Sequence, residues 1–313
     1  MIRLLLWRLA LAVPLLVIVS LLTFLLIAVA PGDPAATVLG NSITDERLAE
    51  VRAQLGLDQP LLVQYWNWVS SAFQGDLGKS LLTSQPVMAT IGQRIGVTMS
   101  LVVFALIVST VGGLLIGMVG ALRGGWVSRV LEWVAVVASA VPPFWLGFLL
   151  VTWFAIQAPL FPATGYITPA HSIQGWLHSL VLPVATLVAA PMMGIAKQTK
   201  DSMQESLAKD FVAALRADGM SERRIIWRHV LRNAAIPIVT LVGVFFIAML
   251  GGTVFAETVF SLPGLGSLVV SSAQTGDFPV IQGVVVVLCL GVVIVNFLVE
   301  IAYGWLNPKA RTT

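Results

Sequence analysis

The sequence predicts an all-α integral membrane protein with six transmembrane helices, and three observations lead to that fold class. Of the 313 residues, 58% are apolar and only 11% are charged, whereas a soluble domain is about 25% charged. The charges are absent from stretches long enough to cross a bilayer, which requires about 20 apolar residues. The Lys and Arg residues gather in alternate connecting segments. A water-soluble domain, a disordered chain and a fibrous repeat are excluded by this composition.

The six spans follow from the charge-free stretches. The stretches without Asp, Glu, Lys or Arg cover residues 9–31, 95–122, 133–196, 233–256 and 278–299. The third is too long for one crossing and is interrupted by prolines, so we interpret it as two spans, near 134–156 and 177–196. The apolar run of the first span is about twice the 7–15 residues of a secretory signal, so we expect it to be retained as an anchor.

Cytoplasmic segments of membrane proteins are enriched in Lys and Arg, which gives the orientation. With the N-terminus inside, only Arg47, Arg52, Lys79 and Arg94 of the 18 basic residues lie outside. The sequence therefore predicts that both termini are cytoplasmic. This distribution also explains the basic composition without a nucleic-acid partner.

The outer segment 32–94 contains two predicted helices. The first covers 45–55, with Thr44 as N-cap and Gly56 as the stop signal. The second covers 61–73, follows Pro60 and is rich in aromatic residues, which fits either an interfacial helix or ordinary packing on the bundle. Within the second span, Gly113 and Gly117 have the spacing that permits close helix packing.

The inner segment 197–233 is the most polar part of the chain. We expect a helix over 199–217, a break at Asp218-Gly219, and a second helix over 221–231 with Ser221 as N-cap. Such helices are consistent with a docking surface for a soluble partner, and equally with a solvated positive loop.

The residues give little support to catalysis in this chain. The string 75–80, Gly-Asp-Leu-Gly-Lys-Ser, lacks the first glycine of a phosphate-binding loop because Phe73 stands there. No Asp or Glu lies inside a predicted span, and the single Cys289 cannot form a disulfide framework or a structural zinc site. We therefore expect no catalytic residue, no metal site and no cofactor in this chain. Because ion-coupled carriers place ionisable groups in the membrane, we expect energy to enter from another subunit.

The inner segment resembles the EAA motif of permease subunits of bacterial ABC importers. The resemblance rests on residues 210–219 (Asp-Phe-Val-Ala-Ala-Leu-Arg-Ala-Asp-Gly), on 229–233 (His-Val-Leu-Arg-Asn) and on Ile236-Pro237. Gly219 matches the central glycine, whereas Ala213 and Arg232 replace the usual Glu and Pro. The His-x-Leu-Arg-Asn variant is typical of the peptide and nickel branch. Further strings of that branch occur along the whole chain, at 31–34, 55–60, 75–80, 142–147, 257–266 and 277–279.

This resemblance implies a type I ABC importer permease fold in one domain, 1–313, with an extracytoplasmic insert at 32–94 and a cytoplasmic coupling segment at 197–233. It implies location in the bacterial cytoplasmic membrane. The implied partners are a homologous second permease, two cytoplasmic ATPase subunits that bind ATP and Mg²⁺, and an extracytoplasmic substrate-binding protein.

The resemblance also assigns site residues. ATPase coupling is expected at Ala213, Ala214, Leu215, Gly219, Ser221, Arg223 and His229. An outer gate or binding-protein contact is expected at Glu257, Pro263, Gly264 and Asp277, for which static packing is an equal alternative. The expected cargo is a di- or oligopeptide. The alternatives are a nickel or nickel-chelate permease of the same family and, from another class, a self-contained channel or secondary carrier. No substrate-binding residue is assigned.

Overall fold

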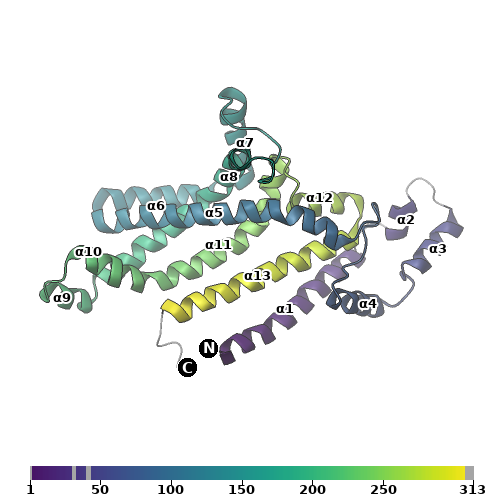
Figure 1. The fold of residues 1–313 in the computed structure, drawn as a ribbon, viewed down its shortest axis with the longest axis horizontal. Coiled ribbons are helices and arrows are strands. Elements are labelled where there is room, and N and C mark those ends of the chain that lie inside the picture. Colours follow the sequence, from purple (N-terminus) through teal and green to yellow (C-terminus); the bar gives the residue numbers. More distant parts are fainter. Residues whose placement is uncertain (1, 30–32, 40–43, 307–313) are drawn as a thin grey trace. The chain divides into compact units, whose positions relative to one another are not determined.

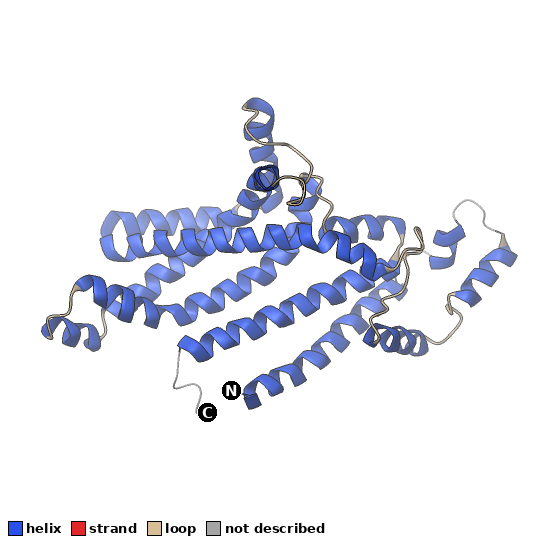
Figure 2. Ribbon diagram, viewed as in Figure 1, coloured by secondary structure: helices blue, strands red, loops and turns tan. Residues whose placement is uncertain are grey.

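A computed structural model describes residues 2–29, 33–39 and 44–306, and these are almost entirely α-helical (Figures 1 and 2). Within those ranges the only β-type pairing is an isolated antiparallel bridge between Lys79 and Pro86. The predicted all-α class is therefore confirmed. Pro31 and Gly32 of the 31–34 string, and the basic residues Lys309 and Arg311, lie outside the described residues.

Five of the described helical segments are long and apolar enough to cross a membrane. They are Ala10–Val29 within α1 (Ile2–Val29), α5 (Val87–Arg123), α8 (Ile173–Leu207), Glu222–Val259, which ends in α11 (Leu231–Val259), and Phe278–Trp305 within α13 (Phe278–Leu306). A sixth crossing is formed if α6 (Gly125–Ala140) and the pair α7 (Pro143–Val151) and η1 (Thr152–Gln157) count as one broken span. This agrees with the six predicted spans.

The predicted span near 134–156 is a broken one, because the chain bends by 94° between α6 and α7. Pro142 and Pro143 cause the break. A residue that precedes proline is disfavoured in the α conformation, and Val141 accordingly has ψ 119° and Pro142 ψ 134°. The helix restarts with Pro143 in its first turn, where the missing N–H is not needed.

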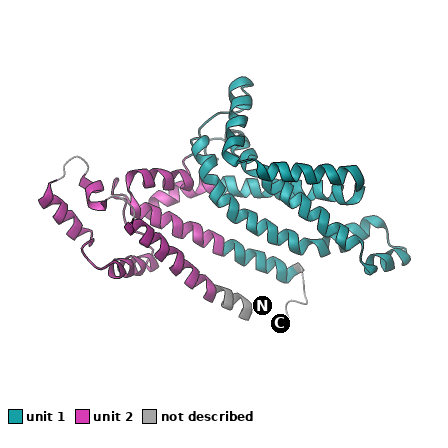
Figure 3. Cartoon of the chain, turned by 180° about the vertical axis from the view of Figure 1, so that it is seen from behind, with its two compact units in different colours: residues 1, 99–262, 294–313 teal, residues 2–98, 263–293 magenta. Residues whose placement is uncertain are grey.

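The chain divides into two compact units (Figure 3). Unit 1 comprises residues 1, 99–262 and 294–313, and unit 2 comprises residues 2–98 and 263–293. The long helices α5 and α13 contribute to both.

In unit 1, glycines on α5 allow it to lie directly against α8. A Cβ atom on Gly113 would come within 2.8 Å of the Ile195 side chain, and one on Gly117 within 2.4 Å of the Ala196 carbonyl oxygen. These distances are too short for any side chain, so the two backbones are in contact. The packing role predicted for the Gly113 and Gly117 pair is confirmed.

Unit 2 contains the outer insert, whose helices are α2 (Pro34–Leu39), α3 (Asp45–Gln54) and α4 (Leu61–Phe73), together with α12 (Leu265–Thr275). The Thr44 hydroxyl accepts a hydrogen bond from the Arg47 N–H, and Gly56 has φ +68°, as expected for a capped start and a glycine stop. The core of this unit is a cluster of apolar side chains from the loop after α4, the start of α5, α12 and α13: Leu77, Val87, Ile91, Leu265, Leu268, Val280 and Val284.

The packing interpretation of α4 is confirmed on one side of the helix, whereas its interfacial position stays a prediction. The Tyr65 hydroxyl lies 2.8 Å from Ser20 Oγ and donates to the Val17 carbonyl oxygen at 3.1 Å, so this side of α4 packs on α1. Trp66 and Phe73 are 69% and 82% exposed, as in an interfacial helix.

Candidate functional site

The predicted coupling segment folds into a short helix between two long ones. The expected helix 199–217 is interrupted: α8 ends at Leu207 and α9 (Asp210–Ala217) starts after a turn at Ala208-Lys209. After α9 the chain turns again and enters α10 (Glu222–Arg224), a π-helical turn η2 (Ile225–Val230), and α11. Figure 1 shows α9 and α10 together at the end of unit 1.

The turn after α9 depends on Gly219. The Gly219 N–H donates to the Arg216 carbonyl oxygen at 3.0 Å and the Met220 N–H to that of Leu215 at 3.1 Å, which closes the end of α9. Gly219 has φ +77°, a left-handed conformation that costs other residues about 1–2 kcal/mol. A Cβ there would meet nothing within 4 Å. The requirement for glycine is therefore conformational and not steric.

An ion pair joins the two sides of this turn. Arg216 Nε donates to Glu222 Oε1 at 2.6 Å, and an Nη2 atom donates to Oε2 at 3.2 Å. These hydrogen bonds and the negative charge of Glu222 raise the pKa of the Arg216 guanidinium above its ordinary value. The bidentate geometry fixes direction as well as distance. It therefore orients α10 relative to α9.

Beneath the turn lies an apolar core within unit 1. Met203, Val212, Ile225 and Val230 are all 0% exposed and belong to one cluster with Ile195. This core anchors α8, α9, η2 and α11 to one another. Rigid attachment of this kind is what a segment needs in order to transmit a movement to the spans.

Most of the predicted coupling residues lie on the surface of this framework. Ala213, Ala214, Gly219, Ser221 and Arg223 are exposed, whereas Leu215 and His229 are half-buried. Ser221 occupies the predicted N-cap position, but its hydroxyl makes no capping bond. Their role in coupling stays a prediction. The arrangement leaves one face of α9, with small side chains, open to a partner.

Lys200 lies outside the predicted coupling residues, yet it is the most unusual charge in the segment. Its side chain is only 4% exposed, and its Nζ forms ion pairs with Glu132 of α6 and, at 3.2 Å, with Asp201. The Glu132 side chain is 49% exposed. One sequence signal for the burial of Lys200 is helical periodicity. Lys200 shares a helix face with buried neighbours, which are Ile195, Ala196, Thr199 and Met203.

The predicted outer residues are distributed over both units. In unit 2, Asp277 is 4% exposed, and its carboxylate accepts hydrogen bonds from Ser80 Oγ at 2.5 Å and from the Leu81 N–H at 3.0 Å. The structure thus brings together two strings, 75–80 and 277–279, that are far apart in the chain. Gly264 precedes α12, whose first N–H, from Leu265, donates to Thr98 Oγ1 at 2.8 Å.

Glu257 lies in α11 in unit 1 and is fully buried. Pro263 lies in the short connection between α11 and α12. Contact of Glu257 with a binding protein would therefore require a change in this conformation. The gate role of Glu257, Pro263, Gly264 and Asp277 stays a prediction.

Among residues 2–29, 33–39 and 44–306, no group of three or more His, Cys, Asp or Glu side chains is arranged to hold a metal ion.

Comparison with family models gives matches along nearly the whole chain. Residues 110–312 match the model of the binding-protein-dependent transport system inner membrane component, and residues 1–102 match the N-terminal model of the same membrane components.

Comparison with known proteins gives relatives of the same length. A probable peptide ABC transporter permease of Sinorhizobium fredii is 38% identical over 305 residues, covering 97% of each chain. The glutathione transport system permease GsiC of Escherichia coli is 37% identical over 300 residues, covering 96% of this chain and 95% of its own. A crystal structure of the inward-facing MetNI methionine ABC transporter contains a chain with a similar fold, with TM-score 0.57 at 16% identity, over 72% of this chain and all of that one.

Proposed function

The chain belongs to the family of binding-protein-dependent transport system inner membrane components, and from this premise we propose that it carries di- or oligopeptides across the membrane. As a family member it is a multi-pass inner-membrane permease subunit of an ABC importer and not an enzyme itself. The observation that carries the proposal is the end-to-end similarity to permeases named for peptide and for glutathione. Glutathione is a tripeptide, so both relatives are named for the same class of cargo.

The family name itself specifies dependence on a binding protein. We propose that the complete importer contains this chain, a homologous second permease and two cytoplasmic ATPase subunits that bind ATP and Mg²⁺. The solute path is then formed between the two permeases, and both termini of this chain are cytoplasmic.

In this proposal α9 is the element that meets the ATPase. Its exposed alanines have small side chains, so this face of α9 fits closely into a groove of the partner. The Arg216–Glu222 pair keeps the turn in one orientation. When the ATPase subunits close on ATP, α9 moves with them. The shared core of Met203, Val212, Ile225 and Val230 then transfers this movement to α8 and α11 as rigid elements.

The test is uptake by the reconstituted complex. The two permeases and the ATPase subunits are placed in proteoliposomes with ATP inside and binding protein outside, and uptake of radiolabelled trialanine is measured. We expect uptake that requires both ATP and the binding protein. Uptake of a nickel chelate with no trialanine uptake would contradict the proposed cargo, and solute flux through this chain alone would contradict the importer.

A further inference from the structure

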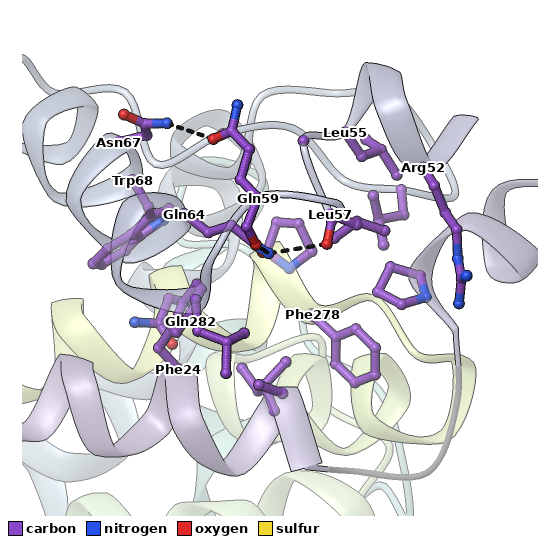
Figure 4. Close-up of a pocket in the computed structure, with 18 of the residues that line it drawn as sticks. Phe24, Arg52, Leu55, Leu57, Gln59, Gln64, Asn67, Trp68, Phe278 and Gln282 are labelled. Carbon is purple, nitrogen blue, oxygen red and sulfur yellow. Dashed lines mark hydrogen bonds between the residues drawn. The ribbon is translucent and has the colours of Figure 1, made fainter. Parts of the chain in front are cut away.

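Unit 2 contains a cavity of about 780 Å³ on the outer insert (Figure 4). Its walls come from the end of α1, from α3 and α4 with their connection, and from the start of α13. This volume falls within the range of sites that bind small molecules, about 300–1,000 Å³. None of the expected coupling residues lines it.

Carboxamide side chains form much of the polar lining, and several are held in place by the loop before α4. Gln64 Nε2 donates to the carbonyl oxygens of Leu57 and Gln59, at 3.2 and 2.7 Å. Asn67 Nδ2 donates to Gln59 Oε1 at 3.2 Å. Figure 4 shows these bonds along one wall of the cavity. The amides are thus oriented before any ligand arrives, and each retains further donor or acceptor capacity.

Two buried polar atoms of the cavity wall have no partner in the described part of the chain. Gln282 is 3% exposed; its Nε2 donates to the Ser20 carbonyl oxygen at 2.8 Å, but its Oε1 accepts no hydrogen bond. The indole Nε1 of Trp68 is likewise buried and unpaired. Unpaired buried groups each cost about 1–3 kcal/mol and are rare. The Gln282 oxygen is an acceptor and the Trp68 N–H is a donor, so together they can pair with the N–H and the C=O of a peptide group.

The charged residues that line the cavity indicate which kind of ligand it can bind. Arg52 is paired with Asp33 at 2.9 Å, and Asp58 and Asp76 also line the cavity. With three aspartates and one arginine the lining has a net charge of −2. A phosphate-bearing lipid headgroup is therefore disfavoured, whereas the ammonium group of a peptide is attracted. Phe24, Trp68 and Phe278 provide apolar surface for side chains.

We propose that this cavity is a second, outer binding site for a short peptide, separate from the path between the permeases. The carboxamides and the two unpaired atoms hydrogen-bond the peptide backbone, and the aspartates attract its N-terminal ammonium group. The site rests on the proposed peptide cargo, and it holds peptide at the outer face of the permease. Gln282 and Trp68 both line this cavity, and their buried unpaired atoms reach the peptide by rotation of the side chains.

Saturation-transfer NMR of trialanine with the full chain in lipid nanodiscs tests the site. We expect binding that is several-fold tighter for trialanine amide, which lacks the carboxylate, and several-fold weaker for N-acetyl-trialanine, which lacks the ammonium group. Trp68→Phe, which removes only the N–H, should weaken binding about tenfold, the loss of one hydrogen bond. Ala53→Trp fills the cavity from an exposed position on α3 and should abolish binding without disturbing the core.

Gln85→Leu is the matched control, because Gln85 is an exposed carboxamide of the same insert outside the cavity lining. Equal peptide binding by Ala53→Trp and the unsubstituted chain would overturn the site. So would a co-purified lipid, detected by native mass spectrometry, that is lost only in Ala53→Trp. If the complete importer takes up trialanine but the cavity binds none, this inference falls and the proposed function stands. If neither occurs, the proposed function falls as well.

Discussion

At the scale of single residues, Gly219 has the clearest conformational requirement. Its φ of +77° is unfavourable for other residues, most of all for β-branched ones, whereas Asn tolerates it better. Gly219→Val should therefore lower ATP-dependent uptake strongly, and Gly219→Asn should retain most of it. The measurement is uptake and binding-protein-stimulated ATPase activity in proteoliposomes. Full uptake with normal stimulation in Gly219→Val would contradict the assigned role.

Lys200 and Glu132 should respond unequally to substitution. Glu132→Gln leaves a buried cation with only Asp201 as its partner, whereas Lys200→Met leaves a half-exposed carboxylate that water can reach. We expect Glu132→Gln to be the more destabilising, by about 1–3 kcal/mol, and to lower the thermal unfolding midpoint further. Lys197→Met is the control, since Lys197 is 51% exposed and its pair with Asp201 contributes little. Equal midpoints for Glu132→Gln and Lys200→Met would refute this asymmetry.

Asp277 holds the end of the 75–80 string in unit 2, because its buried carboxylate accepts hydrogen bonds from Ser80 Oγ and from the N–H of the next residue, Leu81. Bonds to a charged group contribute about 1.5–3 kcal/mol each. Asp277→Ala should therefore destabilise the chain far more than Asp76→Ala, since the described bond of Asp76 is an exposed one to the Gly78 N–H. Thermal unfolding in detergent measures both. A midpoint for Asp277→Ala as high as that for Asp76→Ala would show that this contact is dispensable.

At the scale of elements, the contact of α5 with α8 is the most constrained. Gly117→Leu would drive a side chain into the Ala196 carbonyl, so the helices must separate and lose their packing. Gly92→Leu, on the same helix with nothing within 4 Å, is the control. We expect a low yield of folded protein and a lowered thermal unfolding midpoint for Gly117→Leu but not for Gly92→Leu. If both variants unfold at the same temperature, the helices are not in backbone contact.

Local signals predicted some elements well and missed others. The limits of α3 and α4 follow from Thr44, Gly56 and Pro60, which act within a few residues. The bend at Pro142-Pro143 was missed because residues 133–196 lack charge, and apolar composition alone does not distinguish a straight span from a broken one. The π-helical turn η2 has no local sequence signal.

In the candidate coupling site, the local turn was predictable from the sequence, whereas the contacts between distant residues were not. The motif at 210–219 predicted the turn at Gly219, because a left-handed turn is specified by one residue. The turn at Ala208-Lys209, which separates α9 from α8, was not predicted. The Lys200–Glu132 pair and the Ser80–Asp277 bond join residues 68 and 197 positions apart. Such contacts depend on how helices pack, and no periodicity within one helix reveals the partner.

At the scale of the whole molecule, the chain is a permease subunit of an ABC importer, and we propose that its energy comes from partner ATPase subunits. The Arg216–Glu222 pair joins α9 to α10, and the buried Lys200 ties α8 to α6 through the half-exposed Glu132. The similarity to a chain of an ABC transporter, at TM-score 0.57 and 16% identity, shows a shared fold.

The most direct measurement of the central claim is cross-linking of α9 to the ATPase. Cys289 is the single cysteine, so Cys289→Ala gives a background into which Ala213→Cys is introduced. A short cross-linker with one thiol-reactive and one photoreactive end should join the cysteine at position 213 to the ATPase subunit in membranes that contain the complete importer. Gln85→Cys in the insert, tested in the same way, should give no such product. A product from Gln85→Cys with none from Ala213→Cys would contradict both the predicted orientation and the role of α9.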